Sequence, residues 1–93
     1  MSPSYERQEV ERFVKERMAD LISRPELAAE FKEDTALEEV GIDSVLMVSL
    51  MVQLEQKFDI FYEDDELTSD NFATVGIIAE RLMKKLSVAE IRP

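Results

Sequence analysis

The run from Ser44 to Leu54 limits the possible folds of this chain more than any other feature, because none of its eleven residues carries a charge. Apolar residues in and just after the run recur at helical spacing and predict one buried helix face, made of Val45, Val48, Met51, Leu54 and Phe58. Other apolar residues lie elsewhere around the same helix, which we expect to end near Lys57. A helix this apolar must be surrounded by other helices or present apolar surface to a partner.

Two further segments have the pattern of amphipathic helices. In the first, between a start at Pro3 or Ser4 and an end at Ser23-Arg24-Pro25, the apolar positions are Val10, Phe13, Val14, Met18, Leu21 and Ile22. In the last, which Thr74 is expected to cap, they are Val75, Ile78, Ala79, Leu82, Met83 and Leu86. Residues 87–93 are expected to form a frayed tail.

A short helix, the aromatic residues and the lack of a hairpin signal complete the prediction of the fold. Thr68–Phe72 is typical of a short capped helix, and the aromatic residues Phe58, Phe61 and Phe72 are expected in the core. The chain has only two glycines and no Asn-Gly hairpin signal. We therefore expect an all-α four-helix bundle, with three long helices, one short helix and a long loop between the first and second helices. At 93 residues the chain is expected to form a single domain, with its core over about residues 5–86.

The long loop from Pro25 to Asp43 contains several local signals. Residues 25–31 are compatible with a short helical turn, and Thr35-Ala36-Leu37-Glu38 has the pattern of a capping box. Gly41 allows a backbone conformation closed to other residues, and Asp43 is a good N-cap for the helix that follows.

Composition excludes several classes of function. The chain has no cysteine and no histidine, which removes thiolate and imidazole ligands and the usual general base, so we expect no catalytic residue and no metal site. The acidic run Glu63–Glu66 lacks the spacing of a calcium loop and is expected to be a solvated charge run. No apolar segment is long enough to span a membrane, and residues 1–7 lack an apolar signal core, so a cytoplasmic location is expected.

The formal net charge of −10 disfavours nucleic acid and anionic membranes as partners, because both require a basic face. It favours partner proteins with basic surfaces, which the field of the acidic chain would attract. The alternative interpretation is that the acidic residues only keep a small domain soluble.

Ser44 is the candidate functional residue. It is expected in the first turn of the apolar helix, where backbone N–H groups without intrahelical partners and the helix dipole favour an anion such as a phosphate ester. Alternatively, Ser44 is only a helix-terminal residue. A hydrolase elbow is excluded, because it needs a glycine where Leu46 stands and a histidine that the chain lacks.

The pattern Asp34-x-x-Leu37-x-x-x-Gly41-x-Asp43-Ser44, followed by Val45, Val48, Leu54 and Phe58, resembles the acyl carrier protein family of fatty-acid, polyketide and nonribosomal peptide synthesis. The resemblance covers about residues 8–86. It implies that Ser44 carries a covalent 4'-phosphopantetheine, which a phosphopantetheinyl transferase takes from coenzyme A and whose thiol holds the cargo as a thioester. It also implies that Asp43 helps the transferase to place its metal and coenzyme A, and that Leu37 and Ile42 hold the loop to the bundle.

The chain departs from fatty-acid carriers on the second helix. Where those carriers usually have acids two and five residues after the serine, Leu46 and Ser49 stand here. Leu46, Met47 and Val52 are therefore predicted to contact partner enzymes, as on carriers for polyketides and peptides. We expect a monomeric, free-standing carrier in specialised biosynthesis, loaded by an acyl- or aminoacyl-transferring enzyme, and Met1 and the short ends favour this over a piece of a synthase. The alternatives are a fatty-acid carrier and an unmodified acidic helical adaptor.

Overall fold

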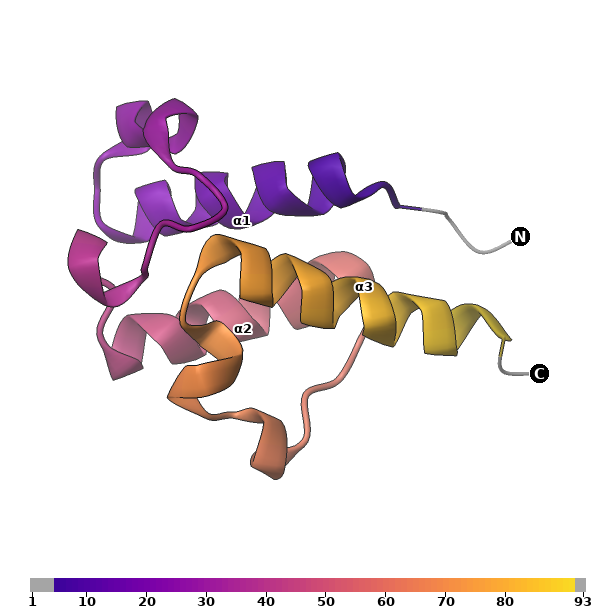
Figure 1. Cartoon of the computed structure of the whole chain (residues 1–93). Helices are drawn as coiled ribbons and strands as arrows, with labels where there is room; N and C mark the ends of the chain where they lie inside the picture. The colour runs from indigo at the N-terminus through magenta and orange to yellow at the C-terminus, as the bar shows by residue number, and fades with distance from the viewer. Residues whose placement is uncertain (1–4, 92–93) are drawn as a thin grey trace.

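The computed structural model describes residues 5–91, without the side chains of Ser69 and of residues 87–91. In chain order the elements are α1 (Arg7–Leu21), the 3-10 turns η1 (Pro25–Glu30) and η2 (Glu38–Val40), α2 (Ser44–Phe58), the 3-10 turns η3 (Asp64–Glu66) and η4 (Ser69–Phe72), and α3 (Val75–Ile91). The expected all-α bundle, with three long helices, one short helical segment and a long first connection, is confirmed (Figure 1).

The helix ends differ from the expected ends in two places. The expected start at Pro3 or Ser4 lies outside the described residues, and α1 begins at Arg7 after a capping box formed by Glu6 and Glu9. The prediction of a frayed tail was wrong for residues 87–91, because α3 continues to Ile91. Thr74 caps α3 as expected, since its hydroxyl oxygen accepts a hydrogen bond from the Ile77 N–H at 3.2 Å.

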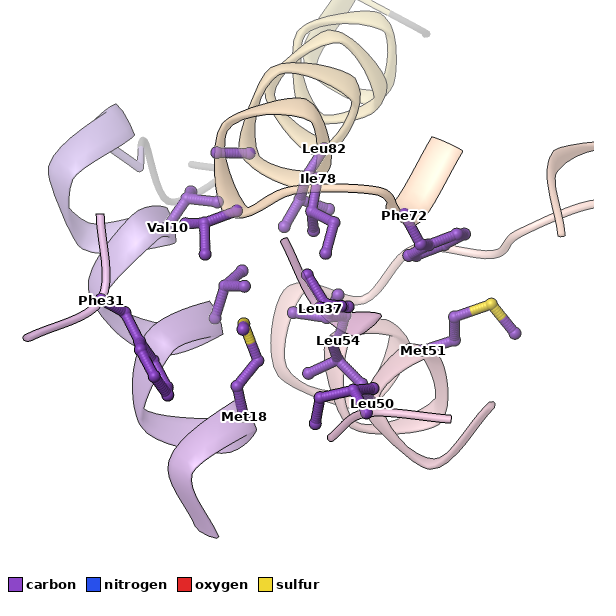
Figure 2. Close-up of a cluster of buried hydrophobic side chains, with 14 of the residues drawn as sticks. Val10, Met18, Phe31, Leu37, Leu50, Met51, Leu54, Phe72, Ile78 and Leu82 are labelled. Atoms are coloured by element: carbon purple, nitrogen blue, oxygen red, sulfur yellow. The ribbon is translucent and has the colours of Figure 1, made fainter. Parts of the chain in front are cut away.

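The core lies where the three long helices meet. α1 packs against both α2 and α3, and fully buried side chains from each of them meet in the interior. Figure 2 shows Val10 and Met18 of α1 facing Leu50 and Leu54 of α2, with Ile78 and Leu82 of α3 above them. Close packing of this kind is the main term that stabilises a small domain without disulfides.

The predicted buried face of α2 was wrong in its first turns. Met51, Leu54 and Phe58 are buried, but Val45 is 72% exposed and Val48 is 53% exposed. Leu50 and Leu54 are fully buried and determine which face of α2 meets the core, and at helical spacing Val45 and Val48 lie away from that face. The apolar surface that a helix of this composition must expose is therefore at its beginning.

The aromatic residues are divided between core and surface. Phe58 and Phe72 are buried as expected, and the ring of Phe58 makes edge-to-face contacts with Tyr5 and Phe13 of the α1 region. The prediction for Phe61 was wrong, because this residue is 72% exposed. Asp59 adopts a left-handed conformation that ends α2, and the next residues leave the helix axis with Tyr62, rather than Phe61, directed into the core.

Two caps predicted in the loops do not form. Thr35 does not cap the turn after it: its hydroxyl accepts from the Lys32 N–H, and its carbonyl accepts from the Val75 N–H at 3.2 Å. Together with an isolated β-bridge between Ala36 and Thr74, this pairing holds Thr35 in the loop away from the η2 turn. The short helix at Thr68 is the 3-10 turn η4, which has no side-chain cap among the described atoms.

The same pairing fixes the loop against the start of α3. The Gly76 N–H donates to the Glu33 carbonyl at 2.8 Å, and a Cβ on Gly76 would lie 3.1 Å from that oxygen. Arg7 of α1 forms ion pairs with Glu11 and Glu33. The long loop is therefore tied to both α1 and α3, and it delivers the segment before Ser44 to a fixed position.

Candidate functional site

Ser44 is the first residue of α2, and its side chain is exposed. The beginning of α2 lies at the end of the molecule opposite the start of α1 and the end of α3 (Figure 1). The first backbone N–H groups of the helix have no partner one turn earlier, and the dipole of this 15-residue helix places partial positive charge there. The hydroxyl of Ser44 is thus accessible at a position that favours a phosphate ester.

Asp43 fixes the start of the helix. Its carboxylate accepts a hydrogen bond from the Leu46 N–H at 2.9 Å, and its carbonyl accepts from the Met47 N–H at 2.8 Å. The predicted N-cap is therefore confirmed. Asp43 itself is exposed, as is Ser44 beside it.

Gly41 reverses the chain just before the site. Its φ of +98° lies in the left-handed region, where a side chain is strained. The Ile42 N–H then donates to the Leu37 carbonyl at 2.9 Å, and both side chains are buried. The expectation that Leu37 and Ile42 hold the loop to the bundle is confirmed, and they make the approach to Ser44 rigid.

A groove with a volume of about 760 Å³ has Ser44 among the residues that line it. Its apolar part is formed by side chains of α2 and of the segment that leads to α3: Met47, Val48, Met51, Leu67 and Phe72. Figure 2 shows Met51 and Phe72 together on the side of the core away from α1. The groove provides apolar surface to a group attached at Ser44, so the site fits a long covalent arm.

The charged residues that line this groove are all acidic. They are Glu38 of η2, Asp43 and Asp70 of η4. Carboxylates attract a cationic group and repel an anionic one at close range. The groove therefore favours a tethered ammonium group over a tethered carboxylate.

Around Ser44 the exposed surface of α2 is apolar. Val45, Val48 and Val52 are 72%, 53% and 43% exposed, and their spacing of three and four residues aligns them along one face. Of the three predicted contact residues, only Val52 is this exposed, because Leu46 and Met47 are half-buried against the core. Contact of these residues with a partner remains a prediction.

Sequence reasoning missed four residues of this region. Val45 and Val48 were assigned to the core, and Leu67 and Asp70, which line the groove, were not assigned to the site at all. The uncharged run gave a usable signal for the two valines, because not every side of such a helix can be buried. Only the folded loop brings Leu67 and Asp70 close to α2, so no local pattern could have identified them.

The acidic run after α2 is more ordered than expected. Glu63 and Glu66 cap the η3 turn, and Glu66 forms an ion pair of 2.8 Å with Lys85 of α3. Over the part of the chain that the structure describes, no three acidic side chains are grouped in a way that could hold a metal ion. Within the same part, no helix is long and apolar enough to cross a membrane.

Comparison with known proteins identifies the type of domain. The family model described as "Phosphopantetheine attachment site" matches residues 12–82. The chain is 32% identical over 69 residues to an aminoacyl carrier protein of Bradyrhizobium diazoefficiens, which covers 74% of this chain and 77% of that protein. It is 33% identical over 75 residues to a D-alanyl carrier protein of Lactococcus lactis, covering 77% of this chain and 95% of that protein.

Similarity extends to proteins named for acyl cargo. An acyl carrier protein of Sulfurovum is 46% identical over 48 residues, a match that covers 50% of this chain and 61% of that protein. No solved structure gives a significant match to the chain.

Proposed function

The chain belongs to the phosphopantetheine attachment-site family of carrier proteins, and on this basis we propose that Ser44 is the residue that carries the group. Members of this family are carriers rather than catalysts, and their cofactor is a covalently attached 4'-phosphopantetheine. When bound, this group supplies the thiol that holds an acyl or aminoacyl intermediate as a thioester.

The observation that carries the assignment is the position of the Ser44 hydroxyl. It is exposed at the first residue of α2, next to Asp43, whose carboxylate caps the helix, and it belongs to the lining of the 760 Å³ groove. Ser49, on the same helix, is half-buried and lies more than a turn away from the helix start. The helix N-terminus favours the phosphodiester, while Asp43, which is exposed, is available to the metal that the transferase brings with coenzyme A.

We infer that the cargo is an aminoacyl group, held by a free-standing carrier of a specialised pathway of the nonribosomal peptide or polyketide type. The acidic lining of the groove supports an ammonium-bearing cargo, and the aminoacyl and D-alanyl carriers among the relatives support the same class. A fatty-acyl cargo is the second candidate, and the relatives named acyl carrier proteins favour it.

The partners proposed are a phosphopantetheinyl transferase, a loading enzyme and downstream biosynthetic enzymes. Their docking surfaces would combine an apolar patch that fits Val45, Val48 and Val52 with basic groups that attract the acidic carrier. Leu46 and Met47 would contribute only their exposed part to this contact, because each is packed partly against the core. We propose that the carrier acts as a monomeric single domain in the cytoplasm, without nucleic acid or membrane as partners.

Peptide mapping tests the attachment site. After incubation with coenzyme A and a transferase of broad specificity, digestion should place the added phosphopantetheine on the peptide that contains Ser44. A modification on the peptide of another serine would refute the assignment. No modification at all would favour the unmodified adaptor.

A comparison of the thermal stability of differently loaded forms tests which cargo the groove favours. Coenzyme A analogues with amide-linked alanyl, propionyl and succinyl groups would be attached to the apo protein, and the thermal midpoint of each product compared. Because the groove is acidic, the thermal midpoint should be highest for the alanyl form, lower for the propionyl form and lowest for the succinyl form. Asp70→Asn should reduce these differences in midpoint, whereas Asp65→Asn, outside the groove, should not. Equal midpoints for the three forms would contradict the aminoacyl proposal.

A further inference from the structure

The segment between Tyr62 and Phe72 is anchored in the core at its two ends. Tyr62 and Phe72 are both buried, and their rings meet edge to face with centroids 5.3 Å apart. The Tyr62 N–H donates to the Glu55 carboxylate of α2 at 2.8 Å, which fixes the first end. The Ala73 carbonyl accepts from the Leu37 N–H at 3.1 Å, which fixes the second. The chain therefore leaves the core and returns to it at one pair of aromatic rings.

Residues 63–71, which lie between these anchors, have little contact with the rest of the chain. None of their described side chains is buried, and only Glu66 and Asn71 are half-buried. These two side chains organise the segment from within. The Asn71 amide donates to the Glu66 carbonyl at 2.9 Å, and the Glu66 carboxylate accepts from the Glu63 N–H at 2.8 Å. A segment with few buried contacts opens at a lower free energy than the core beside it.

Lys85 of α3 makes the one ion pair that joins the described side chains of residues 63–71 to a long helix. Its ammonium lies 2.8 Å from the Glu66 carboxylate and 5.3 Å from the centroid of the Tyr62 ring. Both Lys85 and Glu66 are half-buried, so salt screens their attraction less than that of an exposed pair. The aromatic ring adds a cation–π attraction. Lys85 therefore holds both the middle of the segment and the residue at its base.

We propose that residues 63–71 form a flap that opens about the contact between Tyr62 and Phe72, with Lys85 as the latch that holds the flap against α3. Opening breaks the ion pair with Glu66 and leaves the hydrogen bonds inside the flap intact. Because both aromatic anchors stay in the core, the three long helices do not separate. Local openings of this kind occur on the microsecond to millisecond timescale.

The flap forms part of the groove described above. Leu67 and Asp70 belong to the flap and line the groove, whereas Ser44 lines it from α2. Opening of the flap therefore changes the shape of the groove without moving Ser44. Lys85 does not line the groove, so it acts as a positioning residue for the groove wall. This inference depends on contacts within the chain, and it does not depend on whether Ser44 is modified.

Relaxation dispersion of the backbone amides tests the latch. In Lys85→Met, residues 63–71 should share one exchange process, with the population of the open form raised about fivefold over the wild type, while α1 shows no exchange. Lys85→Arg keeps the charge and should restore the wild-type population. Lys84→Met is the matched control, because Lys84 is the neighbouring lysine and its nearest acid is Glu80, at 3.8 Å.

A distance measurement shows whether the exchange is an opening of the flap. The chain has no cysteine, so nitroxide labels can be placed at Asp65→Cys on the flap and at Gln8→Cys on α1, both exposed positions. Adding Glu66→Gln to this labelled pair removes the charge that Lys85 binds, and a second distance population should appear. An unchanged distance distribution in Glu66→Gln, or the same dispersion in Lys85→Met as in Lys84→Met, would overturn the proposal.

Discussion

The Asp43 carboxylate accepts a 2.9 Å hydrogen bond from the Leu46 N–H, and this contact determines that Ser44 is the first residue of α2. Asp43 has an extended backbone, whereas Ser44 is already helical. Ser44 therefore lies in the first turn of the helix, and it also lines the groove. The residue that caps the helix is therefore also the residue that orients the candidate attachment site.

Asp43 has two separable roles, and two substitutions distinguish them. Asp43→Ala removes the cap and should lower the free energy of unfolding by about 1 kcal/mol, whereas Asp43→Asn keeps a capping oxygen and should change it little. Both variants lose the carboxylate and should be modified more slowly by a transferase. Urea denaturation and the initial rate of modification measure the two effects. Normal modification of Asp43→Asn would show that the charge has no role.

Gly41 should tolerate no other residue without a loss of stability. Its φ of +98° is strained for any side chain, although a Cβ there would meet only Ile22 at 4.0 Å. Gly41→Ala should therefore destabilise the protein by about 1–2 kcal/mol through backbone strain and not through a clash. A thermal melt measures the loss. Asp59→Gly is the opposite case, because Asp59 already has a positive φ, and this variant should be more stable than the wild type.

The sequence correctly predicted those features of the fold that depend on residues close together in the chain. The helical periodicity of residues 10–22 and 75–86, the cap at Asp43 and the turn at Gly41 are all recovered, because each depends on neighbours in the chain. The failures depend on tertiary contacts. Thr35 was assigned to a capping box, but pairing with Val75 directs its backbone elsewhere. Val45 and Val48 were assigned to the core, but α2 packs through the face of Leu50 and Leu54, which leaves the two valines exposed.

The α2 surface offers a test of docking that separates function from stability. Val48→Asp changes an exposed residue, so it should leave the thermal midpoint nearly unchanged while it weakens transfer to or from partner enzymes. Leu50→Asp is the matched control, because Leu50 is fully buried and a charge there should prevent stable folding. Leu46→Asp should be intermediate in stability. Unimpaired partner reactions in Val48→Asp would remove the apolar face from the proposed interface.

The ion pair between Glu66 and Lys85 predicts how stability depends on pH. Burial opposes ionisation of Glu66, but the hydrogen bond from the Glu63 backbone and the contact with Lys85 outweigh it, so the pKa of Glu66 lies below its usual value of 4.5. A carboxyl with a lowered folded-state pKa stabilises the fold above its unfolded pKa, and that contribution is lost as the pH falls through the folded value. Stability should therefore decrease as the pH falls below about 4.5.

Lysine variants isolate this contribution. Lys85→Met should reduce the loss of stability between pH 5 and pH 3, relative to the wild type, because it removes a contact that holds the pKa of Glu66 low. Lys84→Met is the control, since Lys84 is well exposed and its nearest acid, Glu80, is 3.8 Å away. Urea midpoints at several pH values give the comparison. If both variants follow the wild type, the ion pair does not contribute to acid sensitivity.

Intact mass spectrometry shows whether Ser44 carries the phosphopantetheine. The apo protein, Ser44→Ala and Ser49→Ala would each be incubated with coenzyme A and a transferase of broad specificity. We expect a gain of one phosphopantetheine in the wild type and in Ser49→Ala, and no gain in Ser44→Ala, with all three proteins folded by circular dichroism. A Ser44→Ala protein that still gains the mass, or a folded wild type that never does, would contradict this assignment.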